Sequence, residues 1–238
     1  KVIENAMKLN FFMKKSNFMF WQGYLGISVF VIFNSIAMLF YPGGTYLDSN
    51  TVGYQFFYNF FSNLGEWTAR NGEVNIVSAT LFNSSLVIFA LSYFSFFISF
   101  LKLEVKYINS KWLRYLLIAS ISISILSFIF ISVFSAEETS KFWHLVFVKM
   151  AFRTLFIHAV LQTYLVIKIS KFDKFISFAT LGFTILLFLF LLVMDFGPSA
   201  HGSQEGLFIQ VTAQKTIVAG ILIYFFFQIR TALRLSKD

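Results

Sequence analysis

Six long apolar stretches run through the sequence and limit the folds that it can adopt. A helix that crosses a bilayer needs about 20 mostly apolar residues, and each stretch reaches that length. None of them alternates apolar and polar residues as the strands of a membrane barrel do. Only helices and closed barrels satisfy their backbone groups in hydrocarbon, so we expect an all-α polytopic membrane protein, a bundle of six transmembrane helices. The predicted spans cover about residues 17–41, 75–101, 113–134, 142–167, 175–196 and 206–229.

The composition supports lipid as the solvent of most of the chain. Of the 238 residues, 58% are hydrophobic and 13% are charged, whereas a soluble domain has about 25% charged residues. The net charge of +8 would favour nucleic acid as the partner of a soluble protein, but in a membrane protein lysines gather on cytoplasmic loops. We therefore expect membrane lipids as partners, other membrane protein subunits as a further option, and no nucleic acid. The chain has no cysteine, which excludes disulfides, thiolate catalysis and Cys-ligated metal sites.

The connecting segments predict a single transmembrane domain, residues 1–238, whose longest hydrophilic loop follows the first span. Pro42-Gly43-Gly44 and Gly197-Pro198 close the first and fifth spans, because neither turn can continue a helix. The aromatic block at residues 54–61 is too short to span, so we expect an interfacial or re-entrant helix in this first outer loop. Residues 1–16 are basic and partly aromatic, and we expect them to lie along the membrane surface as a short amphipathic segment. The first apolar run is too long for a cleavable signal peptide, and we expect it to act as its own insertion signal.

The positive charges predict the orientation of the chain. Fourteen of the nineteen Lys and Arg residues fall on the N-terminal segment, the loops after the second and fourth spans, and the C-terminal tail. All of these segments lie on one side of a six-span protein, whereas the loops of the other side carry Arg70 and Lys141 alone. Since cytoplasmic loops are enriched in Lys and Arg, we expect a multi-pass protein of the cell membrane with both termini in the cytoplasm.

Three further cations, Lys149, Arg153 and Lys215, fall within the predicted spans. An ionisable side chain near the bilayer centre costs roughly 2.5–3.5 kcal/mol on insertion scales, so each of them needs a partner or a wet cavity. They lie about 10–16 Å below the outer ends of their helices, at about 1.5 Å per residue. At about 100° per residue, Lys149 and Arg153 share one face of the fourth span, and two histidines and Gln162 share the opposite face. We expect a helix with two polar sides to lie at the centre of the bundle.

Two interpretations of these cations stay open. In the first they are structural, and Lys149 pairs with Asp195 or a loop glutamate while Arg153 and Lys215 bond carbonyls and amides. In the second, surplus positive charge in a cavity that opens outward binds an anionic group such as a lipid phosphate or carboxylate, for which Arg and Lys are suited by charge and donor number. The ligand-binding residues are then Lys149, Arg153, Lys215, Gln210 and Gln214, and the possible ion-pair partners are Asp195, Glu66 and Glu73.

His144 and His158 are separated by thirteen residues, the spacing at which one helix of a cytochrome b-like bundle holds two stacked haems. Such sites need matching ligands from a second helix. The remaining histidine, His201, lies in a loop, so we expect no haem, no other cofactor and no metal. His144 and His158 are also the candidate acid–base catalysts, with a purely structural hydrogen bond as the alternative role.

The order of these features resembles a prokaryotic family of six-helix integral membrane proteins of unknown function, distantly grouped with the DRAM and Frag-like proteins. The family carries an S-x-L-G element in its first outer loop, matched here by Ser62-Asn63-Leu64-Gly65. Its third span ends in a Phe-Pro turn and a histidine opens the fourth, where this chain has Phe134-Ser135 and then His144. A Glu-Arg pair starts the family's sixth span, where this chain has Ile209-Gln210-Val211. The resemblance implies six helices and, through eukaryotic relatives linked with lipid remodelling and membrane trafficking, a role that involves lipid.

These features lead to one main hypothesis and two alternatives. The main hypothesis is an integral membrane protein whose cationic, outward-facing intramembrane pocket, between the fourth and sixth spans, binds an anionic lipid head group. The alternatives are a non-enzymatic accessory or scaffold subunit of a larger membrane complex, and a lipid-modifying enzyme. A transporter is disfavoured, because no inverted repeat and no pair of broken helices is evident in the sequence. A water-accessible cavity that reaches Arg153 would favour the pocket, whereas a dry, ion-paired core would favour the scaffold.

Overall fold

The part of the chain that the structure describes folds into six long helices, each long and apolar enough to cross a membrane. This computed structural model describes residues 2–236, with the side chains of residues 18–105 and 107–236. The prediction of an all-α six-helix bundle is confirmed. The elements are α1 (Val2–Phe40), the 3₁₀ turn η1 (Phe61–Gly65), α2 (Ile76–Glu104), the 3₁₀ turn η2 (Val105–Tyr107), α3 (Lys111–Val133), α4 (Lys141–Lys168), α5 (Lys174–Phe196) and α6 (Gln204–Leu235).

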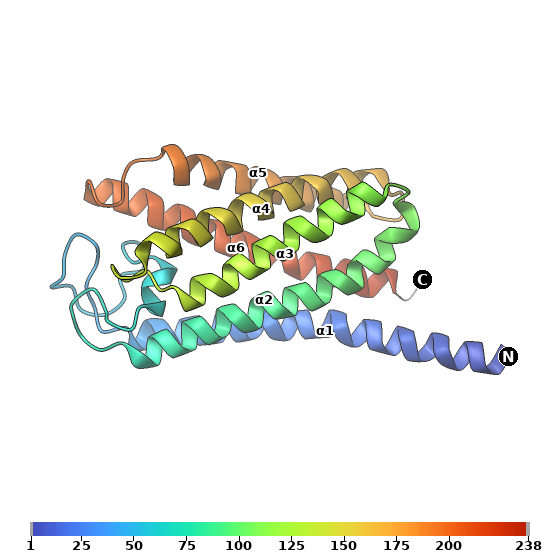
Figure 1. Ribbon diagram of the computed structural model, residues 1–238, viewed down its shortest axis with the longest axis horizontal. Coiled ribbons are helices and arrows are strands. Elements are labelled where there is room, and N and C mark those ends of the chain that lie inside the picture. The colour runs from blue at the N-terminus through green and yellow to red at the C-terminus, as the bar shows by residue number, and fades with distance from the viewer. Residues whose placement is uncertain (1, 237–238) are drawn as a thin grey trace.

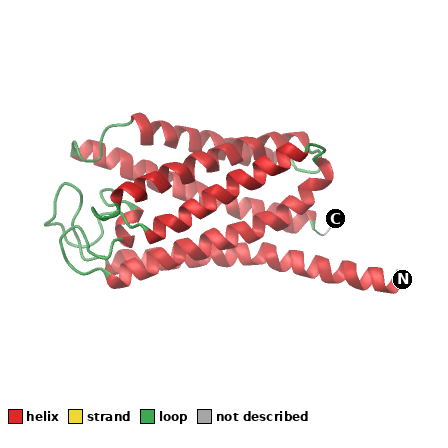
Figure 2. Ribbon diagram, in the orientation of Figure 1, coloured by secondary structure: helices red, strands yellow, loops and turns green. Residues whose placement is uncertain are grey.

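The helices form a ring in chain order. Each helix packs against the next, and α6 returns to pack against α1. Both chain ends lie at one end of the bundle (Figure 1), and the long first loop lies with the α3–α4 and α5–α6 connections at the other end (Figure 2). We call these the inner end and the outer end of the bundle. An even number of crossings requires this arrangement of the termini.

Side-chain caps and breaker residues decide where the helices begin and end. Ser110, Asp173 and Ser203 accept hydrogen bonds from the backbone N–H groups three residues later, at 3.3, 2.9 and 3.0 Å. These caps satisfy backbone donors that the first turn of a helix leaves free. At the other ends, α1 stops just before Pro42 and α5 stops just before the Gly197-Pro198 turn. The predicted spans therefore agree with the helices to within a few residues at most ends.

Two expectations about the segments outside the spans are wrong. Residues 2–16 continue α1 as one helix in the direction of the first span (Figure 1), instead of forming a separate surface segment. Residues 54–61 form no α-helix, and the 3₁₀ turn η1 begins only at the last of them, Phe61. The side chain of Asn59 explains the second difference, because it accepts from Gln55 N at 2.8 Å and donates to Gly44 O at 2.7 Å. These side-chain bonds compete with helical backbone bonds and fold the segment as a loop.

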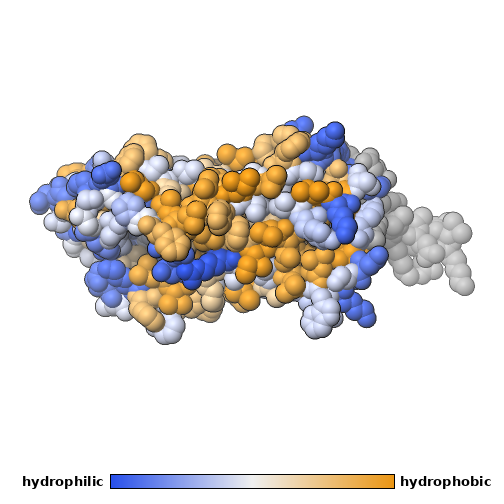
Figure 3. Space-filling view, turned by 90° about the horizontal axis from the view of Figure 1, so that it is seen from above, coloured by the Kyte–Doolittle hydropathy of each residue, from blue (hydrophilic) through white to orange (hydrophobic). Residues whose placement is uncertain are grey.

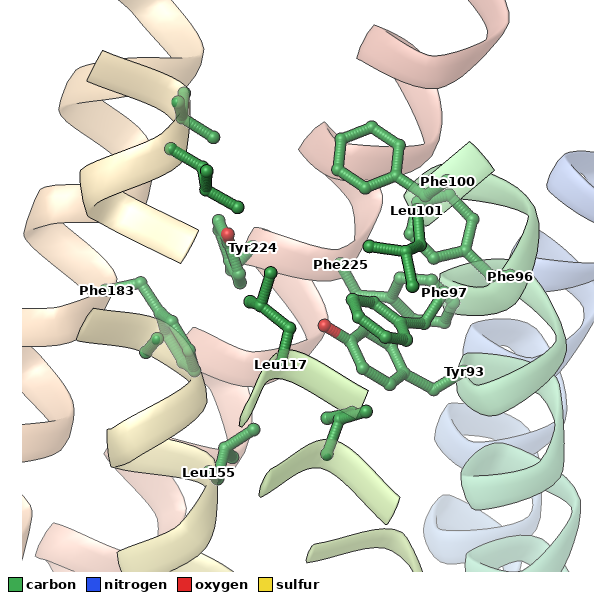
Figure 4. Close-up of a cluster of buried hydrophobic side chains, with 14 of the residues drawn as sticks. Tyr93, Phe96, Phe97, Phe100, Leu101, Leu117, Leu155, Phe183, Tyr224 and Phe225 are labelled. Carbon is green, nitrogen blue, oxygen red and sulfur yellow. The ribbon is translucent and has the colours of Figure 1, made fainter. Parts of the chain in front are cut away.

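The bundle core is aromatic. Phe96, Phe97, Phe100 and Phe225 are fully buried, and Figure 4 shows them beside Tyr93 between α2 and α6. The rings of Phe96 and Phe225 meet edge to face with their centroids 5.1 Å apart, a geometry that aromatic quadrupoles favour. Because lipid tails are as apolar as these side chains, close packing holds the helices together in a membrane. The outer surface is accordingly hydrophobic along its middle and hydrophilic at both ends, apart from a hydrophilic strip within the face seen in Figure 3.

Candidate functional site

The polar residues of α4 divide between two faces, as their spacing predicts. His144, His158 and Gln162 are buried, whereas the side chains of Lys149 and Arg153 are 48% and 53% exposed. The expectation that α4 lies at the bundle centre is wrong, because the face with the two cations is on the outer surface. Exposed apolar residues of the same helix surround that face: Met150, Ile157 and Val160. Two cations therefore stand on a surface that is otherwise suited to lipid.

The carboxylate of Asp195 forms ion pairs with both Lys149 and Arg153. Arg153 Nη2 donates to both oxygens of Asp195 on α5, each at 3.0 Å. Lys149 Nζ lies 3.9 Å from Asp195 Oδ1. The pairing of Lys149 and Asp195 expected for a structural role is thus present, but Arg153 makes the closer contact. We call Lys149, Arg153 and Asp195 the basic face site, and its formal charge is +1.

The early end of α5 explains how Asp195 reaches Arg153. Gln210 of α6 donates to two backbone oxygens at the end of α5, Val193 O at 2.8 Å and Pro198 O at 3.0 Å. Gln210 follows the first residue of α6, Gln204, by six positions, which is about 9 Å along a helix. The outer end of α5 is therefore recessed below that of α6 (Figure 1). The recess lies on the outer side of the basic face site. It brings polar backbone groups of the α5–α6 connection into the outer half of the bundle.

Lys215 does not belong to the basic face site. It is 7% exposed, and its ammonium donates to Tyr54 Oη at 2.8 Å and to Asn59 O at 2.7 Å. The ring centroids of Tyr54, Phe56 and Phe61 lie 4.6–5.0 Å from it. The neighbouring residue Gln214 accepts from Phe61 N at 2.8 Å. The expectation of one pocket lined by all three cations is wrong, because Lys215 and Gln214 are turned to the first outer loop and fasten it to α6.

The loop glutamates are also separate from the three cations. Glu66 is buried, pairs with Arg70 and accepts from Asn63 Nδ2 at 3.0 Å. Burial raises the pKa of the Glu66 carboxyl to about 7, against the lowering effect of the Arg70 guanidinium. Glu73 is exposed in the turn before α2, and among the described residues its carboxylate forms no ion pair with Lys149, Arg153 or Lys215. Neither glutamate is the partner that we expected.

Arg70 holds the outer loops together. Its guanidinium lies 4.0 Å from the ring centroid of Tyr46 and donates to Ala136 O at 3.0 Å. Thr68 N donates to Glu137 Oε1 at 2.9 Å. Both bonds join the first outer loop to the α3–α4 connection. Satisfied hydrogen-bond networks rigidify the segments that they join, so this partly buried cluster forms the outer cap of the bundle.

The two histidines have different surroundings. His144 Nδ1 lies 2.8 Å from Phe134 O, which ties the start of α4 to the end of α3. His158 is buried in the inner half of α4, its ring 4.8 Å from that of Phe97 and its Nδ1 3.4 Å from Ser120 Oγ. Its Nε2 has no hydrogen-bond partner among the described residues. Within the described part of the chain, no three His, Asp or Glu side chains are grouped as metal ligands would be.

The sequence prediction missed a buried carboxyl group that bonds the polar face of α4 at Gln162. Glu104, the last residue of α2, is fully buried and accepts a hydrogen bond from Gln162 of α4. The predicted second span ended at Leu101, which left Glu104 in a loop among lysines. The polar face shared by His158 and Gln162 was the available signal, since buried polar groups require partners.

Comparisons with known proteins add no function to this geometry. The resemblance to the DRAM and Frag-like group stays a prediction. No protein-family model, curated protein sequence or solved structure is detectably similar to this chain.

Proposed function

We propose that this integral membrane protein binds an anionic lipid head group at the basic face site. The observation that carries the proposal is the surplus cation: two half-exposed basic side chains share one carboxylate on a helix face that is otherwise apolar. Charged groups inside a membrane are costly unless they are paired or hydrated. Asp195 neutralises one of the two cations. A lipid phosphate would neutralise the second without bringing a partner of another kind into the bilayer.

The recess above α5 supports a head group in particular. Asp195 precedes the last residue of α5, so the site lies where backbone polar groups already interrupt the apolar surface. Lys149 is one helical turn closer than Arg153 to the outer end of α4, and long basic side chains extend toward the interface. Arg153 donates to Asp195 through Nη2, so its other guanidinium N–H groups can donate to phosphate oxygens.

The orientation of the chain is part of this proposal. The Lys and Arg bias favours an orientation with both termini in the cytoplasm, in which the basic face site faces the outer leaflet of the cell membrane. The bound lipid is therefore an anionic lipid of that leaflet. Catalysis is not part of the proposal, because the histidines considered as acid–base groups are buried on the opposite face of α4.

The test compares lipids retained by variants purified in mild detergent and read by native mass spectrometry. Nanodiscs of phosphatidylcholine with a minor fraction of phosphatidylglycerol would supply the neutral and anionic competitors. The double change Lys149→Gln and Arg153→Gln should reduce retained phosphatidylglycerol about tenfold. Lys168→Gln is the matched control, because it removes a cation from the exposed inner end of the same helix. Equal phosphatidylglycerol in both variants would refute the proposal.

The same preparation distinguishes the scaffold alternative. If the basic face instead pairs with an acidic group of another membrane subunit, the double variant should lose a co-purifying protein and keep its lipid. Loss of lipid without loss of a protein supports the head-group site.

A further inference from the structure

An apolar cavity of about 80 Å³, partly open between the helices, lies at the centre of the helix ring. All six helices line it, through side chains that include Phe30, Phe89, Ile125, Leu155, Phe183 and Val218. Figure 4 shows four side chains that border it, Tyr93, Leu155, Phe183 and Tyr224. A cavity needs about 10–15 Å³ of accessible volume to hold one water molecule, so this cavity has room for roughly five to eight waters.

The few polar side chains around the cavity are already bonded to protein. Tyr93 Oη donates to Gln228 Oε1 at 3.2 Å, and Gln228 Nε2 donates to Tyr224 Oη at 2.9 Å. Ser124 Oγ donates to Ala151 O at 2.9 Å. A buried water needs two to four polar partners, and these side chains direct their hydrogen bonds elsewhere. The chemistry of the lining thus selects an occupant without polar atoms.

The depth of the cavity indicates which apolar part of the surrounding lipid lies at the same level of the bilayer. Phe89 follows the first residue of α2 by thirteen positions and Val218 follows that of α6 by fourteen, which places both about 20 Å below the outer ends of these helices. α2 and α6 are 29 and 32 residues long, about 44 and 48 Å at 1.5 Å per residue, so this depth is near the midpoint of both helices and of the hydrocarbon core, about 30 Å thick, that they cross. The ends of lipid acyl chains meet at this level.

We propose that the central cavity binds the terminal segment of a membrane lipid's acyl chain. This site is separate from the basic face site, because its lining contains neither Lys149 nor Arg153. It requires no particular head group. The bundle would thus be completed by one hydrocarbon chain that enters between the helices from the surrounding bilayer.

The experiment uses phosphatidylcholine with a photoactivatable diazirine at the end of one chain, in nanodiscs with the full-length protein. After illumination, the labelled residues are mapped by peptide mass spectrometry. Labels on inward residues such as Phe89, Ile125 and Val218, in addition to labels on the outer surface, are the expected result. Labels confined to outward residues in the wild-type protein would overturn the proposal.

Cavity-filling variants provide the second arm. Ala90→Phe fills the space from α2 and Val218→Phe fills it from α6, and each should lower the inward labels at least fivefold while outward labels persist. Ile185→Phe is the control, because Ile185 is exposed on α5. Should one filling variant fail to fold, the other and the wild-type map still decide. Inward labels unchanged in a folded filling variant, or obtained with a diazirine isoprenoid and not with the acyl chain, would contradict the proposal. Arg153→Gln should leave the inward labels unchanged, which separates this result from that of the head-group test.

Discussion

Replacing Lys215 with methionine should loosen the first outer loop from α6. The change removes two hydrogen bonds from a charged donor, of 2.8 Å to Tyr54 and 2.7 Å to Asn59, each worth about 1.5–3 kcal/mol. It also removes the cation from three nearby rings, worth about 0.5–2 kcal/mol. The relief of a buried ammonium offsets roughly 2.5–3.5 kcal/mol of this loss. The net loss of stability is then about 3 kcal/mol, or a decrease of roughly 6–12 °C in Tm for a chain of this length.

Thermal unfolding in detergent measures this loss, and limited proteolysis of residues 54–61 reports whether the loop has detached. Methionine keeps the length of the side chain, so the change tests the charge and not the volume. Lys168→Met is the control, because Lys168 is exposed and bonds only Tyr164 of its own helix among the described residues, and its Tm should stay within about 1 °C of the wild type. A Lys215→Met protein that melts with the wild type and keeps its loop protected would show that the ammonium does not fasten the loop.

Three further predictions concern the outer cap, the inner polar pair and the topology. The raised pKa of Glu66 means that the folded protein holds this proton more tightly than the unfolded chain, so stability should fall by up to about 3 kcal/mol as pH rises from about 4.5 to about 7; Glu66→Gln should flatten thermal unfolding across this window, and an unchanged slope would count against burial as the cause. Glu104→Leu leaves Gln162 without its acceptor and should lower the stability by about 1–3 kcal/mol, whereas Glu104→Gln should lower it less; equal Tm values for the two variants would refute this difference. Cysteines introduced at Ser110 and Ser203 should react with impermeant reagents from the cytoplasm and from outside respectively, and labelling from one side would exclude six crossings.

Much of the fold could be predicted because each membrane span is one continuous apolar run of the sequence. An apolar run bounded by Pro42 at one end and lysines at others marks the hydrocarbon core directly, and the helices follow these runs. The loop at residues 54–61 could not be predicted in the same way. Its shape depends on Asn59 reaching Gly44, fifteen residues away, and short aromatic blocks carry no signal for such side-chain bonds.

The candidate site was predictable only in part, for a geometric reason. The helical period fixes the angle between Lys149 and Arg153 on α4, so the two faces of that helix were expected correctly. Periodicity does not give the relative heights of different helices. The sequence puts Asp195 at the outer end of the predicted fifth span and Arg153 about 16 Å below the outer end of the fourth, and the early end of α5 removes that difference in depth. Lys215 shows the same limit, because its partners come from a loop more than 150 residues away in sequence.

The proposal that the basic face site holds an anionic head group is tested most directly by Asp195→Asn. This variant keeps both cations and raises the formal charge of the site from +1 to +2. At about 6 Å and an effective dielectric constant of about 20, the attraction between one added unit of charge and a phosphate is roughly 3 kcal/mol before screening. If screening halves this energy, the affinity for the anionic lipid still changes by a factor of about ten. Native mass spectrometry of the variant should therefore show about tenfold more retained phosphatidylglycerol than the wild type, with phosphatidylcholine unchanged. Unchanged or reduced phosphatidylglycerol together with a lower Tm would contradict the account, because the three charges would then be a structural ion pair and not a lipid site.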